Sequence, residues 1–208
     1  MAATIKPTLA RQWIKGLATH EIPALGFVEL NSISRGLFLT DVALKKAPVR
    51  VIASQPISSG KHCLLFFGDV ASVEESYKAV QESGDGCILR NVFIPSVHED
   101  LVPFLDSIWT DDGHTDQTQV DDSIGIVESH TLAAAILSAD RALKTAKVSL
   151  CRFRLGQGIG GKAYYVLTGK QEEVEAGLEA AATTLKELES FTRVDFIARP
   201  QEEALVHF

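Results

Sequence analysis

The feature that most constrains this chain is a sequence pattern that occurs twice. Gly26-Phe-Val-Glu29 returns as Gly125-Ile-Val-Glu128, 99 residues later. Two further matches follow in the same order: Asp41–Lys45 with Asp140–Lys144, and Gly60-Lys61 with Gly161-Lys162. Solenoid repeats are typically about 20–50 residues long. A repeat of this length therefore indicates a duplicated domain, which usually acts through symmetry.

The length of 208 residues suits two domains of about 100 residues each. We expect an N-terminal extension over 1–22, domains over 23–105 and 123–208, and an acidic linker over 106–122. The linker is rich in aspartate and is interpreted as a solvated connector. A calcium loop is the alternative, but the segment lacks the regular alternation and terminal glutamate of an EF-hand loop.

Charge and composition narrow the class of protein. The net charge is -7 and the pI about 5.4, which argues against a nucleic-acid partner because such proteins normally carry a basic patch. No apolar run is long enough to cross a bilayer, so no membrane partner is expected. Three cysteines without close pairing fit a reducing cytoplasm.

Each half has the pattern of an α+β, ferredoxin-like domain with the element order β-α-β-β-α-β. Ser32 and Thr131 stand where a helix N-cap is preferred. The apolar positions of the first helix follow helical spacing, which predicts a face packed on the sheet. These positions are Ile33, Leu37, Leu44 and Ala47 in one half and Leu132, Ile136, Ala139, Leu143 and Ala146 in the other.

The glycine-rich segment 156–162 fits two phosphate-binding patterns, G-x-G-x-x-G and G-x-x-x-x-G-K. Both need a helix directly afterwards, since its N-terminus holds the phosphate. A strand-forming run, 163–167, follows instead, and Ala163 replaces the Ser or Thr that would hold magnesium. The segment is interpreted as a bend between two strands, matched by 56–61 in the first half.

No other motif predicts catalysis or a metal site. The six histidines lack ligand spacing, and no nucleophile motif occurs. Glu29 and Glu128 are interpreted as surface or interface carboxylates. Lys45 and Lys144 each follow an aspartate by four residues, which predicts an ion pair within the helix.

Taken in order, several segments identify the chain as resembling the tandem-domain shell proteins of bacterial microcompartments, of the single-layer, non-permuted type. They are Gly26–Glu29, Asp41–Lys45, Ser58–Lys61, Ile94–His98, Gly158–Lys162 and Ile197–Pro200. The resemblance covers about residues 24–205. It implies a cytoplasmic, non-enzymatic shell component in which three chains close into a pseudohexagonal homotrimer that tiles the facet.

The resemblance also implies roles for particular residues. Lys45 and Lys144 fall at the family's edge lysine and Arg199 at its edge arginine, whereas Ser96 stands at the arginine position of the first half. The expected partners are hexameric and pentameric shell proteins. The two bends would face the central axis as a pore for small polar metabolites, lined by Pro56, Ile57, Ser58, Ser59, Gly60, Gln157, Gly158, Ile159 and Gly160.

One subgroup of these trimers holds an iron–sulfur cluster on the axis through a cysteine of the first bend. Ser58 occupies that position here, and a cluster needs thiolate. We therefore expect no cluster and no other cofactor.

Two other functions are compatible with a duplicated βαββαβ chain. It could be a regulatory protein that binds a small molecule between its halves, or an enzyme that uses the loop Gly156–Lys162. Assembly separates the three, because only a tile forms trimers that extend into sheets.

Overall fold

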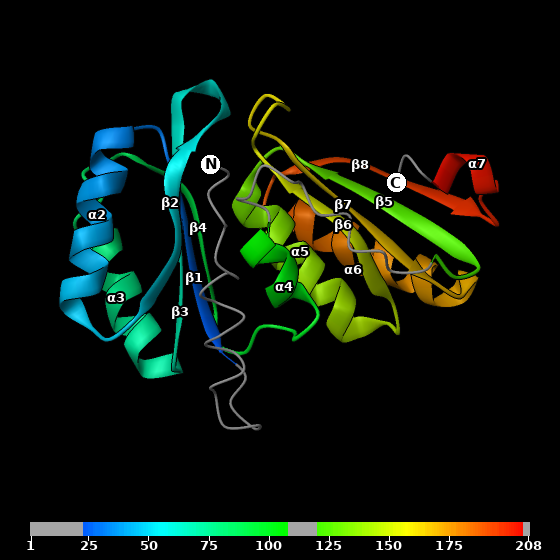
Figure 1. Ribbon diagram of the computed structural model, residues 1–208, viewed down its shortest axis with the longest axis horizontal. Helices are drawn as coiled ribbons and strands as arrows, with labels where there is room; N and C mark the ends of the chain where they lie inside the picture. Colours follow the sequence, from blue (N-terminus) through cyan, green and yellow to red (C-terminus); the bar gives the residue numbers. More distant parts are fainter. Residues whose placement is uncertain (1–22, 108–119, 206–208) are drawn as a thin grey trace, which may run out of the picture.

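The computed structural model describes residues 23–107 and 120–205, so the expected extension and most of the expected linker lie outside the described residues. Each half is a four-stranded antiparallel sheet with two helices on one face (Figure 1). The first half comprises β1 (Ala24–Leu30), α2 (Ile33–Lys46), β2 (Arg50–Ile57), the 3-10 turn Ser58–Gly60, β3 (Lys61–Gly68), α3 (Val70–Glu82) and β4 (Ile88–Ile94). The second comprises β5 (Ser123–Ser129), α5 (Leu132–Thr145), β6 (Ser149–Leu155), β7 (Ala163–Gly169), α6 (Gln171–Glu187) and β8 (Phe191–Ala198). Short helices α4 (Leu101–Ser107) and α7 (Glu202–Leu205) follow the two halves.

The strand orders are β2-β3-β1-β4 and β6-β7-β5-β8, which confirms the α+β fold and its duplication. The caps are confirmed as well: Ser32 accepts the N–H of Arg35, and Thr131 accepts that of Ala134. Helix α2 ends at Lys46 with an extended Ala47, because the residue before Pro48 is pushed out of the helical region.

The prediction for the buried face of α2 is wrong. Gly36, Leu39 and Ala43 face the sheet, whereas Ile33, Leu37 and Leu44 are 39%, 57% and 51% exposed. The helix carries two apolar stripes, and periodicity alone assigned the sheet-facing role to the wrong one. In α5 the predicted residues are all buried, and part of what covers them is the other half of the chain.

The two halves share one core. Helix α5 packs on β1 and β4 of the first sheet as well as on its own sheet and α6. Leu25 and Phe27 of β1 therefore belong to the same buried cluster as Leu132 and Ile136 of α5. Along the molecule the layers alternate: α2 with α3, the first sheet, α5 with α6, and the second sheet (Figure 1).

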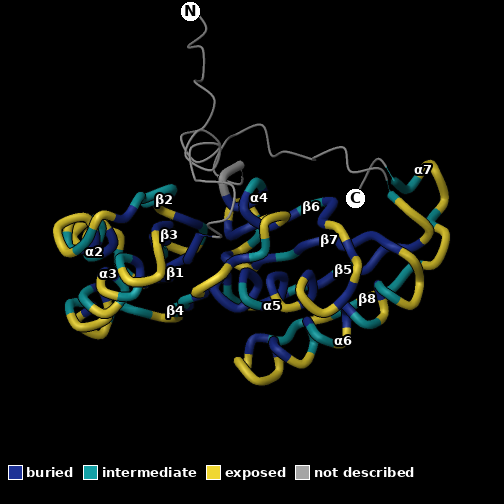
Figure 2. Tube along the Cα trace, turned by 90° about the horizontal axis from the view of Figure 1, so that it is seen from below, coloured by how far each residue is buried: buried dark blue, intermediate teal, exposed yellow. Residues whose placement is uncertain are grey.

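Burial along the chain reflects this order. In Figure 2, α5 is drawn almost throughout in the colour of buried residues, while α2 and α3 at one end of the molecule carry long exposed stretches. No helix in the described ranges is long and apolar enough to cross a membrane.

Candidate functional site

The two bends predicted from the repeat lie side by side. The Gly158 N–H donates to Ser58 Oγ at 3.0 Å, and Ser59 Oγ donates to the Gly160 carbonyl at 3.4 Å. Figure 1 shows both bends at the same end of the molecule, one from each half. Segments about 100 residues apart in sequence thus form one polar rim.

The second bend depends on glycine. Gly156, Gly158, Gly160 and Gly161 all have positive φ between 67° and 78°, a region that only glycine enters without steric cost. A strand follows directly at Ala163, so no helix N-terminus is available for a phosphate, as the sequence indicated.

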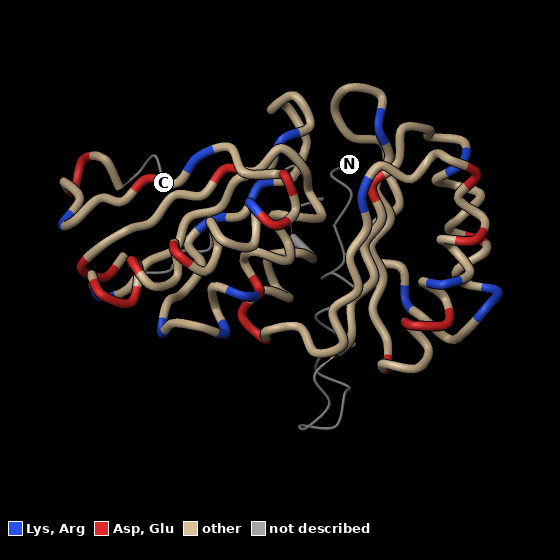
Figure 3. Tube along the Cα trace, turned by 180° about the vertical axis from the view of Figure 1, so that it is seen from behind, with Lys and Arg blue, Asp and Glu red and all other residues tan. Residues whose placement is uncertain are grey.

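Most of the residues predicted to line a pore are at the surface of this rim. Pro56, Ser59, Gly60, Gln157, Gly158 and Gly160 are exposed, and Ser58 and Ile159 are half-buried. Ile57 is only 6% exposed and lies in the shared core, so it contributes backbone to the rim. Within each bend, no acidic or basic residue precedes the final lysine, Lys61 or Lys162; Figure 3 shows basic residues at the base of both loops.

A buried carboxylate joins the two halves behind the first bend. Glu29 is fully buried; its Oε1 accepts from Lys61 Nζ at 2.8 Å and its Oε2 from the Leu132 N–H at 3.0 Å. Leu132 is the first residue of α5, where a negative charge is stabilised by the helix dipole. Glu29 is thus an interface carboxylate that caps the helix of the neighbouring domain.

Its repeat partner has no such contact. The Glu128 side chain is 43% exposed, and its ion pair with Lys162 spans 3.7 Å. Within the described residues, no helix begins beside Glu128 as α5 begins beside Glu29.

The duplicated lysines also differ. Both make the predicted ion pair within the helix, Lys45 with Asp41 and Lys144 with Asp140, each at 2.6 Å. The Asp41 pair is exposed, whereas the Asp140 side chain is 3% exposed and accepts the His98 N–H at 2.7 Å. Lys144 Nζ additionally donates to the Ser96 carbonyl. In the second half, then, the aspartate and lysine bind the first domain of their own chain.

Two apolar surfaces within the described residues are partly exposed, and their repeat counterparts are buried. One is the α2 stripe with Phe38, which is 50% exposed. The other is part of the outer face of the second sheet, where, beside the buried residues Ile124, Cys151 and Val166, the side chains of Ile126, Tyr164 and Ile197 are half-buried. The corresponding residues of the first sheet, Phe27, Cys63 and Ile94, are buried in the shared core.

Comparison with known proteins places the chain in a family. The BMC domain model matches residues 24–97 and again residues 123–200. The chain belongs to the bacterial microcompartment shell protein family. The bacterial microcompartment shell protein PduT of Citrobacter freundii is 31% identical over 179 residues, which cover 86% of this chain and 94% of PduT.

Solved structures agree with the assignment. A microcompartment protein from Desulfitobacterium hafniense superposes with a TM-score of 0.78 at 31% identity, over 89% of this chain and 99% of that one. A fused permuted hexameric shell protein of the RMM microcompartment gives a TM-score of 0.62 at 22% identity, over 88% and 93% of the two chains, and supports the fold.

The edge arginine expected from the family lies at the end of the second BMC domain. Arg199 is 88% exposed, has a φ of 46°, and its N–H donates to the Asp122 carbonyl at 2.8 Å. The backbone is therefore fixed, and the exposed guanidinium forms an ion pair with Asp122, with Nε 3.5 Å from Oδ1.

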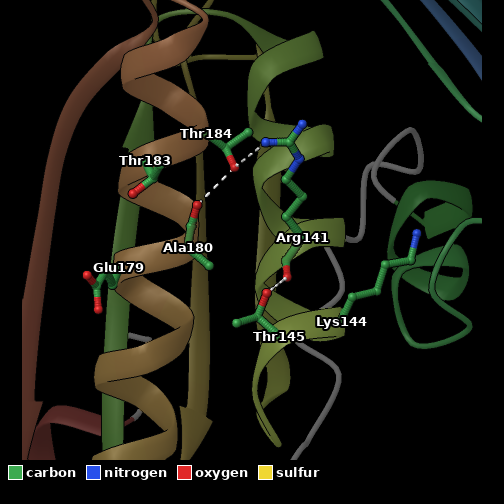
Figure 4. A pocket seen from close by; sticks show the side chains of 7 residues that line it. All are labelled: Arg141, Lys144, Thr145, Glu179, Ala180, Thr183 and Thr184. Atoms are coloured by element: carbon green, nitrogen blue, oxygen red, sulfur yellow. Dashed lines mark hydrogen bonds between the residues drawn. The ribbon is translucent and has the colours of Figure 1, made fainter.

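A surface groove of about 400 Å³ runs between α5 and α6 (Figure 4). Several of its polar side chains have partners within the protein: Arg141 binds Thr184 and Glu187, and Thr145 donates to the Arg141 carbonyl. Figure 4 shows Lys144 directed away from the groove, toward the first domain. Because Arg141, Thr145 and Thr184 are engaged within the protein, we assign no ligand to this groove.

The thiols of Cys63 and Cys151 are not placed to hold a cluster. Burial raises the pKa of Cys63 to about 12 and that of Cys151 to about 11, so both stay protonated at neutral pH. Cys63 lies within β3 beside Gln55, not in the bend. Among the described residues, no group of three or more His, Cys, Asp or Glu side chains is placed to hold a metal ion.

Sequence reasoning missed a buried polar chain under α2. Thr40 Oγ1 lies 2.7 Å from Ser54 Oγ, which lies 3.0 Å from His62 Nε2. Gly36 makes room for this histidine, since a Cβ there would lie 2.1 Å from His62 Cδ2. The available signal was a glycine inside a helix where the second domain has Ala135.

Proposed function

We propose that this chain is a structural tile of a cytoplasmic microcompartment shell, built as a homotrimer with a central opening at the paired bends. The domain limits proposed for it are residues 23–105 and 123–208. The tile has no catalytic role and no iron–sulfur cluster.

One observation carries this proposal. The α2 stripe is exposed, while its repeat partner on α5 is covered by the sheet of the neighbouring domain. If α2 of one chain covers the second sheet of the next, each chain offers one donor face and one acceptor face. Such a head-to-tail contact closes into a ring when the rotation per step allows it.

The duplication favours closure after three chains. Six similar domains related by one repeated step give a pseudohexagon, the outline that the resemblance implies. In each chain the paired bends lie at one end of the contact between the two domains, which we call the seam. Three copies of the bends would therefore surround the axis. Their serine hydroxyls and backbone amides suit a small polar molecule in transit. Charge selection should be weak, since neither bend has a charged side chain before its final lysine.

The outer edge of this ring would carry Lys45, Lys144 and Arg199. Lys144 Nζ already donates to the Ser96 carbonyl in its own chain. The exposed part of the Lys144 side chain would therefore lie where the contact between the two domains reaches this outer edge. Contacts with hexameric and pentameric shell proteins would form along this edge.

Assembly tests the proposal. Purified protein should sediment as a trimer and form sheets or tubes at high concentration, seen by electron microscopy. A regulatory binding protein would instead form one closed oligomer whose melting temperature rises with a small metabolite. A nucleotide-using enzyme would bind nucleotide measurably through Gly156–Lys162. Either of these results, without sheets, would contradict the shell assignment.

A further inference from the structure

The intrachain seam provides a template for the contact between chains. At this seam the Glu29 carboxylate receives the N–H of the first residue of α5, Leu132. The repeat relates Glu29 to Glu128 and Leu132 to Ile33, which is the first residue of α2. Both members of the second pair are present, but Ile33 belongs to the first domain and Glu128 to the second, where it pairs with Lys162.

The acceptor side of the second pair, around Glu128, lies at the surface. A hollow of about 340 Å³ lies beside Glu128, lined by Ile126, Glu128, Ile159, Lys162, Ala163 and Tyr164. Lys162 stands beside Glu128 as Lys61 stands beside Glu29. Leu132 is fully buried in the cluster that holds Phe27 and Cys63, the counterparts of Ile126 and Tyr164.

The donor side is equally exposed. Ile33 is 39% exposed, and the first N–H groups of a helix have no acceptor within the helix. A carboxylate is favoured there by the helix dipole as well.

We infer that Glu128 of one chain caps α2 of the next, accepting the Ile33 N–H while the Ile33 side chain enters the hollow beside it. This inference rests on the proposed ring and specifies the contact that joins neighbouring chains, here called the joint. The occupant is a second copy of this chain, because the same carboxylate, lysine and helix start already meet once inside it.

Two flanking contacts follow from the same correspondence. Asp140 receives the His98 N–H and Lys144 reaches the Ser96 carbonyl within the chain. Their counterparts Asp41 and Lys45 are exposed. Between chains, Asp41 would accept the Gln201 N–H and Lys45 would donate to the Arg199 carbonyl.

The joint can be tested through its backbone donor. Ile33→Ala removes the side chain and keeps the N–H, whereas Ile33→Pro removes the N–H too. Proline is tolerated at the first helical position, and the preceding Ser32 is already extended, with φ -136° and ψ 121°, as a following proline requires. Both variants are made with Glu128 and with Glu128→Ala, and circular dichroism verifies that each one folds.

The measurement is the concentration at which the trimer dissociates, from sedimentation velocity over a dilution series. With Glu128 present, Ile33→Pro should dissociate at a concentration roughly tenfold or more above that of Ile33→Ala, the ratio expected for a hydrogen bond to a charged group. In the Glu128→Ala background the two should be equal, because the acceptor is gone. Glu29→Ala is the matched control: it should lower the melting temperature of the single chain.

Two outcomes would overturn the inference and are distinguishable. If the wild-type chain forms trimers and the proline-to-alanine ratio is the same in both backgrounds, the ring stands and this joint is wrong. If the wild-type chain is monomeric at every concentration, the ring itself is wrong and the joint falls with it.

Discussion

Replacing Leu37 by alanine should weaken the association of chains without weakening the fold. The Leu37 side chain is 57% exposed in the single chain, whereas its repeat partner Ile136 is fully buried. Full burial of a leucine side chain stabilises by about 1.5–3 kcal/mol. Covering the exposed half of Leu37 should therefore contribute about 1–1.5 kcal/mol at each seam.

A chain that leaves a three-membered ring breaks two seams. The loss per departing chain is then about 2–3 kcal/mol, which corresponds to a rise of roughly 30- to 150-fold in the dissociation concentration. Sedimentation velocity over a dilution series measures this quantity directly.

Ile136→Ala is the matched control. Its side chain is buried within one chain, so the change should cost about 2–5 kcal/mol of folding stability and lower the melting temperature by several degrees. Leu37→Ala, measured where the protein is monomeric, should melt like the wild-type monomer. A Leu37→Ala protein that trimerises as tightly as wild type would refute the reasoning, because the α2 stripe would then not lie in the seam.

Other perturbations probe the outer edge of the tile, the buried histidine and the thiols. Lys45→Ala removes one exposed charge at this edge and should suppress sheets in electron micrographs; trimers should persist but dissociate at a higher concentration, because one flanking contact between chains is lost. Unchanged sheets would move Lys45 away from the edge. Gly36→Ala should cost about 1–3 kcal/mol by overpacking against His62, and adding His62→Ala should recover part of it in thermal melts; no recovery would argue against that contact. Burial lowers the pKa of His62, so its contribution to stability is intact above the unfolded value of about 6.5 and is lost as the pH falls from there through the folded value; melting from pH 7 to 5 should show a smaller loss for His62→Ala than for wild type. Incubation with iron and sulfide under reducing conditions should give no visible charge-transfer absorbance, since Ser58 offers no thiolate and Cys63 stays protonated; a stoichiometric signal that persists in Ser58→Ala would overturn the placement of the bend.

Much of the fold could be predicted because the same sequence pattern occurs in both halves of the chain. The repeat fixed the order of elements, and local signals such as the Ser32 and Thr131 caps located the helix starts. The strand that follows Gly156–Lys162 already argued against a phosphate loop, and the structure agrees.

The faces of the elements were harder to predict. Helix α2 has one stripe through Leu39 and Ala43 and another through Leu37 and Leu44, and both have helical spacing. Periodicity identifies an apolar stripe but does not say whether a sheet, another domain or another chain covers it. That choice depends on tertiary packing.

The seam contacts were out of reach for a related reason. Glu29 and Glu128 are the same residue in the repeat, yet only Glu29 is buried at a helix N-terminus. The difference comes from what lies beside each copy, and one sequence does not contain that information. Comparing the two copies in the structure exposes it.

Electron cryomicroscopy of the purified protein would test the central claim most directly. The account predicts a ring of three chains in which α2 of each covers the second sheet of the next, with segments 56–61 and 156–162 around the axis. A solitary monomer, or a ring with these bends on its outer rim, would contradict it.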